Sequence, residues 1–174
     1  AITMHDRNHI VLDLLSYICF YSLGSRLFQL REKTGLFYTA SGGWAIDVHQ
    51  EHGFDYLFAI VSPENVEHAQ GAIMTLIDGI AQSGITKQEL LAARQLYTKE
   101  LIDATTDVRT LAGLFANVET MGIGYDYYDK ALALVHELSV EDLNKTAKEY
   151  INTKDFVRVT VGREAPPAQE HKES

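Results

Sequence analysis

The spacing of hydrophobic residues is helical at the start of the chain and then changes to that of strands. Between Asp6 and Leu23 the apolar positions lie three and four residues apart, which predicts a helix with one apolar face. Ser25 predicts the start of a second helix, because its hydroxyl can accept a free backbone N–H there, and Gly35 predicts the end of that helix. Leu36–Ser41 is rich in aromatic and β-branched residues and therefore favours a strand.

Two more strands are predicted beyond this point. Gly42 and Gly43 either end the first strand or let another backbone come close to it. Trp44–Val48 and Phe54–Val61 have strand-like compositions, and the polar residues 49–53 between them predict a hairpin turn. Strands joined by so short a loop are most simply antiparallel.

The remainder of the chain predicts a run of helices separated by capping residues. Ser62-Pro63-Glu64 favours a helix start and Gly84 a helix end. Thr86 followed three residues later by an acid has the pattern of a capping box. The predicted helices cover residues 62–82, 86–104, 107–121, 127–138 and 139–151, and a final strand covers residues 156–161.

This order of elements predicts an α+β fold with two layers, in which an antiparallel or mixed sheet packs against helices. We expect a single domain over residues 1–163, followed by a disordered tail or linker at residues 164–174. Three or four strands covered by helices leave an exposed sheet edge with unpaired backbone groups. That edge predicts self-association, with a second copy covering it.

Composition narrows the classes of partner. The chain has 15 basic and 24 acidic residues, a net charge of −9, which argues against nucleic acid because phosphate binding needs clustered Lys and Arg. No apolar run approaches the roughly 18 residues of a membrane span. The single cysteine, Cys19, excludes an internal disulfide, and its place on an apolar helical face predicts an inert buried thiol.

Histidine and acidic residues occur together at two places, and neither predicts a metal site. His49, Glu51 and His52 form HxEH, one residue short of the HxxEH pattern of zinc peptidases, and they lie on a predicted turn that does not bring both imidazoles to one face. Glu64 to His68 ends in Glu-His on a predicted helix but has Glu64 where the first histidine is needed. We therefore expect no metal bound by this chain.

Arg31 and Tyr38 are the strongest candidates for a binding role. Arg31 lies near the predicted helix end and Tyr38 early on the strand, seven positions later. A guanidinium offers a planar fork of donors and a phenol one directed hydroxyl, so together they could hold a peptide carbonyl or a carboxylate. The alternative is that Arg31 pairs with a surface carboxylate and Tyr38 is half-buried packing.

Several stretches of the chain resemble the insulinase/pitrilysin family of zinc peptidases, which includes the mitochondrial processing peptidase. The stretch SRLFQLREKTGLFYTASGG at residues 25–43 carries the resemblance, and it is followed by a helix pair with a proline start and a GITKQEL link. The later VETMGIGYDYYDKALALVHELSVEDLNKTAKEYI and the closing FVRVTVG also fit. The match extends to about Gly162 and depends more on the order of these motifs than on any one of them.

The resemblance implies that this chain is most of the metal-free, C-terminal-type half of such an enzyme. In the family, the N-terminal half binds zinc through HxxEH and a distal Glu, and the other half holds the substrate backbone with an Arg and a Tyr seven positions apart. Arg31 and Tyr38 match that pair. The chain has no HxxEH, and the family's opening strands have no counterpart, which suggests a fragment that is inactive alone.

The implied partners are a homologous half that carries HxxEH and zinc, in the same polypeptide or a separate subunit, and an extended peptide substrate. Two alternatives stay open at this stage. One is a non-catalytic scaffold of the same fold, like the core subunits of respiratory complexes, in which Arg31 and Tyr38 only pack. The other is an unrelated α+β ligand-binding domain.

Overall fold

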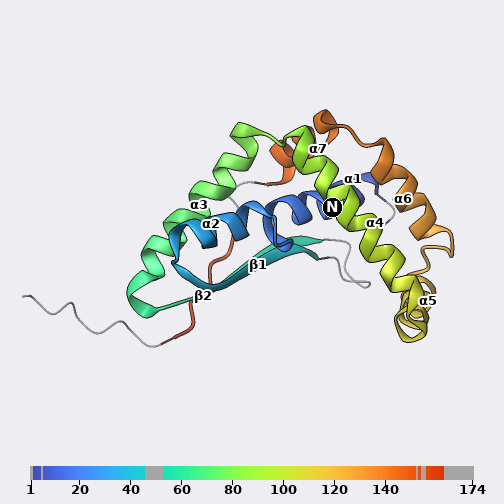
Figure 1. Cartoon of the computed structure of the whole chain (residues 1–174), viewed down its shortest axis with the longest axis horizontal. Helices are drawn as coiled ribbons and strands as arrows, with labels where there is room; N and C mark the ends of the chain where they lie inside the picture. Colours follow the sequence, from blue (N-terminus) through green and yellow to red (C-terminus); the bar gives the residue numbers. More distant parts are fainter. Residues whose placement is uncertain (1, 5, 46–52, 152, 154–155, 163–174) are drawn as a thin grey trace, which may run out of the picture.

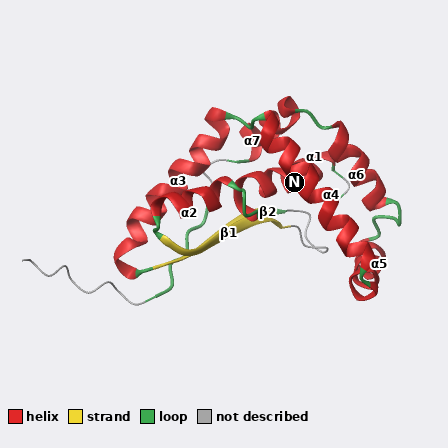
Figure 2. Ribbon diagram, in the orientation of Figure 1, coloured by secondary structure: helices red, strands yellow, loops and turns green. Residues whose placement is uncertain are grey.

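The computed structural model describes residues 2–4, 6–45, 53–151, 153 and 156–162 of the 174-residue chain. Helices lie over one face of a small antiparallel sheet, as the predicted α+β fold requires (Figure 1, Figure 2). The elements in chain order are α1 (Arg7–Ser16), a π-helical turn (Tyr17–Tyr21), α2 (Arg26–Thr34), β1 (Phe37–Ala45), β2 (Phe54–Val61), a 3₁₀ turn (Pro63–Asn65), α3 (Val66–Ser83), α4 (Lys87–Thr106), α5 (Val108–Met121), α6 (Tyr127–Glu137) and α7 (Val140–Tyr150).

Helix α1 is the centre of the core. It contacts β1 on one side and α4, α6 and α7 on others, and Leu12, Leu14 and Leu15 are at most 1% exposed. The predicted single apolar face is therefore wrong: seven of the ten residues of α1 are buried. A helix that is apolar on nearly all sides is stable only where protein surrounds it.

The helical stretch from Arg7 to Thr34 is also apolar enough to meet a length-and-composition test for a membrane span. Its mean hydropathy reaches 1.3, which corrects the estimate that no run approaches that length. In the structure 61% of this window is buried inside the protein, as is typical of a core helix.

The predicted helix boundaries at Ser25, Gly35 and Thr86 are confirmed by their caps, whereas Ser62 forms no side-chain cap and α3 begins at Val66 after a 3₁₀ turn. The Ser25 hydroxyl accepts the Phe28 N–H at 3.2 Å, and Gly35 ends α2 with a φ of +65°, a left-handed conformation that glycine adopts without strain. The capping box at Thr86 is complete, because the side chain of Glu89 also accepts the Thr86 N–H. These contacts are local, which explains why the sequence predicts them.

The first strand continues through its two glycines. The predicted break at Gly42 and Gly43 is wrong, since β1 runs unbroken to Ala45 and pairs with β2. A Cβ on Gly42 would lie 2.5 Å from the Tyr56 carbonyl oxygen and 3.2 Å from the Phe20 Cβ, so this glycine permits a close approach, the other predicted role. The predicted strand at residues 46–48 and turn at residues 49–52 lie outside the described residues.

Strand β2 presents different faces to the core and to solvent. Leu57 packs against the core. No described helix covers the other face of the sheet (Figure 2), and the residues that alternate with Leu57 are exposed. We call these four side chains the aromatic stripe; they are 45–56% exposed and comprise Phe54, Tyr56, Phe58 and Ile60.

The predicted final strand is not formed. Residues 156–161 have no strand partner in the described part of the chain, and Val157, Val159 and Val161 are 78–92% exposed. The segment instead crosses α3, where the Gln70 side chain accepts from Arg158 at 2.9 Å. Alternating residues favour an extended conformation, but a strand also requires a neighbouring backbone with which to pair.

A partly buried polar cluster lies where α1 meets α6. His9 Nδ1 lies 3.2 Å from the Tyr127 hydroxyl and 3.8 Å from Asp13 Oδ2. Burial lowers the pKa of His9 to about 4, despite the nearby Asp6 carboxylate, and burial raises the pKa of Asp13 to about 7. Folding therefore moves the proton of this pair from the imidazole to the carboxyl.

Because the pKa values of His9 and Asp13 shift in opposite directions, their effects on the pH dependence of the free energy of unfolding should cancel. Near pH 5 both the folded and the unfolded chain hold one proton on the pair, so the pair leaves the free energy of unfolding nearly constant from about pH 4.5 to about 6.5. In Asp13→Asn only the lowered pKa of His9 remains, and stability should fall as the pH drops from about 6.5 to about 4. In His9→Gln only the raised pKa of Asp13 remains, and stability should fall as the pH rises from about 4 to about 7.

Urea unfolding at several pH values measures both slopes, each of which should be at most about 1.4 kcal/mol per pH unit. Slopes of the same sign in the two variants would contradict the proton transfer.

The close approach at Gly42 predicts a cost for any side chain there. Gly42→Ala should lower the free energy of unfolding by about 1–3 kcal/mol, because the new methyl group meets backbone atoms of β2. Gly71→Ala is the matched control, since nothing lies within 4 Å of its Cβ position in α3, and it should raise stability by about 0.5–1 kcal/mol. Equal effects at the two positions in denaturant unfolding would refute this account of the sheet.

Candidate functional site

Arg31 and Tyr38 flank the corner at which α2 turns into β1. Arg31 belongs to the last turn of α2 and Tyr38 is the second residue of β1, with the left-handed Gly35 between them. Helix α2 packs against β1, so the two elements that carry these side chains support each other. The fold thus places both residues at one corner of the molecule.

The start of α2 is anchored by Arg26. Its Nε and Nη2 donate to the two carboxylate oxygens of Glu89 at 2.7 and 3.0 Å, and Nη2 also donates to the Gly84 carbonyl oxygen at 2.5 Å. Burial alone would raise the pKa of Glu89, but hydrogen bonds from Arg26 and Thr86 lower it to about 2. A bidentate, partly buried pair of this kind fixes α2 against the link between α3 and α4.

The two candidate side chains are exposed to different degrees and form no hydrogen bond with each other. The Arg31 guanidinium lies over the Phe28 ring, 5.5 Å from its centroid, and within the described residues Arg31 forms no ion pair. Tyr38 is 81% exposed and sits where the β1–β2 register shifts between Phe37 and Thr39. Tyr38 is thus not half-buried packing, and its hydroxyl is accessible to a ligand.

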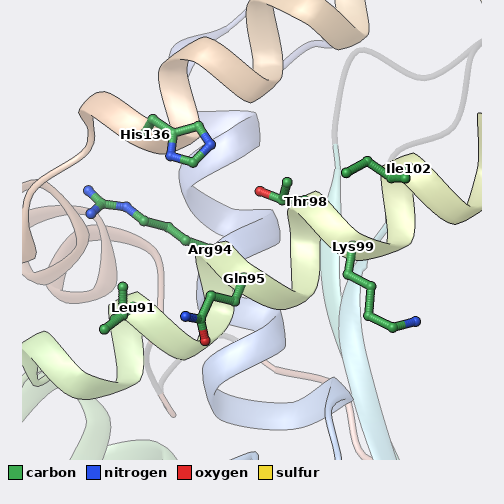
Figure 3. Close-up of a pocket in the computed structure, with 7 residues that line it drawn as sticks. All are labelled: Leu91, Arg94, Gln95, Thr98, Lys99, Ile102 and His136. Carbon is green, nitrogen blue, oxygen red and sulfur yellow. The ribbon is translucent and has the colours of Figure 1, made fainter.

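A separate pocket of about 440 Å³ lies between α4 and α6 (Figure 3). Neither Arg31 nor Tyr38 lines it; its walls are formed by Leu91, Arg94, Gln95, Thr98, Lys99, Ile102 and His136. The sequence did not predict this pocket, because it forms only where His136 of α6 lies beside one face of α4.

Two cationic side chains of this pocket are engaged with the protein, whereas the buried Thr98 hydroxyl has no hydrogen-bond partner within the described residues. Arg94 reaches from α4 to the end of α6, where it donates to the carbonyl oxygens of Val135, at 2.9 Å, and of Leu138. Lys99 pairs with Asp103 on its own helix. The arrangement contains no pair of groups placed for acid–base or nucleophilic chemistry among the described residues, so we take it as a structural feature.

The candidate metal ligands do not form a cluster in the described part of the chain. His49, Glu51 and His52 lie outside the described residues. Glu64 and His68 are both exposed, at the turn and helix start that follow β2. Among the residues that the structure describes, no group of three or more His, Cys, Asp or Glu side chains could hold a metal ion.

The sequence analysis also missed the aromatic stripe. The sequence predicts the strand Phe54–Val61 and a sheet packed against helices, but it does not predict that one face of the sheet carries exposed aromatic residues. The signal was available in the alternation of the strand, because large side chains occupy the outward positions as well as the inward ones. Only the fold shows that the outward face is uncovered.

Comparisons with known proteins agree on one family. A model of the peptidase M16 inactive domain matches residues 2–97, more than half of the chain. A search of curated proteins gave no match.

Solved structures share the fold over most of the chain at low sequence identity. The inactive peptidase domain of a predicted zinc protease from Bordetella parapertussis is 15% identical with a TM-score of 0.75, over 87% of this chain and 81% of that one. The peptidase M16 inactive domain from Pseudomonas fluorescens is 21% identical with a TM-score of 0.73, over 87% of this chain and 36% of that one. A protease from Helicobacter pylori is 23% identical with a TM-score of 0.74, over 85% and 36% respectively.

The present chain therefore spans most of the Bordetella domain but little more than a third of the other two proteins. Identities this low establish a common fold, and the family model supplies the assignment. The chain belongs to the peptidase M16 inactive domain family, the C-terminal-type half of insulinase-type zinc proteases.

Proposed function

We propose that this chain holds an extended peptide substrate for a zinc-bearing homologous half that carries HxxEH. The observation that supports the proposal is the α2–β1 corner, where an 81% exposed Tyr38 and an Arg31 without a described ion pair lie in a domain of this family. Side chains kept only for packing or for a surface ion pair would be engaged with the protein. Within the described residues, neither side chain forms a hydrogen bond or an ion pair through its polar group that would compete with a ligand.

The chemistry of the pair suits a peptide backbone. Arg31 presents several N–H donors in one plane, and the Phe28 ring beneath it limits the orientations of that plane. Tyr38 adds one directed hydroxyl donor. Both groups can donate to carbonyl oxygens of an extended chain, which positions the substrate and stabilises negative charge that develops on a carbonyl oxygen.

Peptide cleavage itself belongs to the partner half in this proposal. Zinc bound there would supply an activated water. The described part of the present chain offers no cluster of metal ligands. The chain alone is therefore expected to bind peptide without cutting it.

Substitution at the corner tests the proposed role. In a complex with the HxxEH-bearing half, Arg31→Ala and Tyr38→Phe should each lower kcat/KM for peptides by about 10²–10³-fold, the usual cost of losing one donor to a developing oxyanion. The measurement is steady-state cleavage of a fluorogenic peptide.

Arg109→Ala and Tyr125→Phe serve as matched controls, because both side chains are exposed and lie on or next to α5, away from the corner. They should leave kcat/KM within about twofold, a range that surface changes seldom exceed. If Arg31→Ala and Tyr38→Phe behave like these controls, the scaffold alternative is favoured and the proposal fails.

Removal of zinc should affect the two halves differently. A chelator should abolish cleavage by the complex, while the Tm of the isolated chain should stay unchanged because no group of three or more His, Cys, Asp or Glu among its described residues could hold a metal ion. Thermal unfolding with and without chelator measures this. A drop of several degrees in the isolated chain would show that it binds metal itself and would contradict the assignment of zinc to the partner.

A further inference from the structure

The outward face of the β1–β2 sheet carries a row of large apolar side chains that are about half exposed. The helices α1, α2 and α3 lie on the opposite side, and the described chain places no helix over this face (Figure 1, Figure 2). The aromatic stripe runs along it, with Phe54 and Tyr56 in ring contact at a centroid distance of 6.3 Å. Exposed aromatic residues that gather in one row mark an interaction site more often than isolated ones do.

The neighbouring strand offers no bulk on the same face. In the antiparallel register, Thr39 stands opposite Ile60, Ser41 opposite Phe58 and Gly43 opposite Tyr56. Paired residues project to the same side of a sheet. The face therefore consists of a ridge of large side chains on β2 beside a lane of small ones on β1.

We propose that this face binds an extended peptide with apolar side chains at alternate positions. Successive members of the aromatic stripe are two residues apart, so their spacing equals the repeat of side chains on one side of any extended chain, about 6.6 Å. The lane above the partly exposed Thr39 and Ser41 gives the peptide room beside the ridge, whereas Gly43 is buried and the Tyr56 ring lies 3.9 Å from its Cβ position. Its apolar side chains can then pack against the aromatic rings.

The size of the face favours a single peptide over a second copy of this chain. The four side chains of the aromatic stripe are each about half exposed and together offer about 400 Å² of accessible surface, whereas each partner in a stable protein–protein interface contributes about 800 Å². A dimer would need much more surface than this face supplies. One extended segment of about eight residues matches its length.

The face is also continuous with the α2–β1 corner. Tyr38 directly precedes Thr39, whose partner Ile60 ends the aromatic stripe. A peptide held at Tyr38 could continue along the lane, and the stripe would then select substrates with alternating apolar residues. This extension to substrate selection rests on the proposed function, whereas peptide binding by the face does not.

Binding to the isolated 174-residue chain tests the proposal without any zinc half. The probe is a fluorescein-labelled nine-residue peptide with Phe or Leu alternating with Ser or Lys, and its control has Thr in place of every apolar residue. Fluorescence anisotropy should show saturable binding of the apolar peptide and at least tenfold weaker binding of the Thr peptide. Equal binding of the two peptides would overturn the proposal.

Phe58→Thr and Phe115→Thr form a matched pair of variants, because both phenylalanines are 49% exposed and only Phe58 lies in the aromatic stripe. Threonine is a good strand former, so the Phe58 variant should keep its fold, as circular dichroism would check. Phe58→Thr should raise the Kd at least tenfold and Phe115→Thr less than twofold. Equal loss in both would show non-specific hydrophobic binding.

Light scattering on the wild-type chain and the same variants tests whether a second copy of the chain occupies the face instead of a peptide. The wild-type chain and Phe58→Thr should have the same mass, and a wild-type dimer that Phe58→Thr converts to monomer would instead assign the face to a second copy and overturn the proposal. Failure here leaves the cleavage test of Arg31 and Tyr38 unaffected. If instead the cleavage test fails, peptide binding by the aromatic stripe can still hold. The experiments therefore test the role of Arg31 and Tyr38 and the role of the stripe independently.

Discussion

The burial of α1 on nearly every side is the constraint on which the rest of the structure depends. Each of the leucines at positions 12, 14 and 15 is excluded from water, and no single neighbour could achieve this. The sheet covers one side of the helix, and α4, α6 and α7 cover others. Because burial of apolar surface is the main favourable term in folding, the positions of these helices follow largely from the need to enclose α1.

The same constraint explains why one face of the sheet is left open. The helices gather where apolar surface must be covered, on the α1 side of β1 and β2 (Figure 1). The opposite face then keeps whatever side chains the alternation of β2 places there. Aromatic residues at those positions gain nothing from the core, so their presence needs a reason outside it, and a ligand supplies one.

The backbone of the α2–β1 corner is held from several directions, whereas the Tyr38 side chain is exposed and Arg31 forms no ion pair within the described residues. Arg26 ties the first turn of α2 to Glu89 by a bidentate pair, and Gly35 permits the tight turn into β1. The contrast between an anchored backbone and accessible side chains is what a binding site requires, since a rigid support reduces the ordering cost when a ligand binds. In this respect the corner differs from the pocket between α4 and α6, where Arg94 is already engaged with backbone carbonyl oxygens.

The sequence by itself determined the local structure of this protein. Caps at Ser25, Gly35 and Thr86, the helices they delimit and the strand Phe54–Val61 all depend on neighbours within a few residues, and the family resemblance rested on the order of these same elements. Only the tertiary structure decided the rest. It determined that α1 is buried on nearly all sides, that β1 continues through Gly42, that residues 156–161 have no strand partner in the described part of the chain, and that the aromatic stripe is exposed. Each of these outcomes depends on which distant backbone or side chain lies alongside.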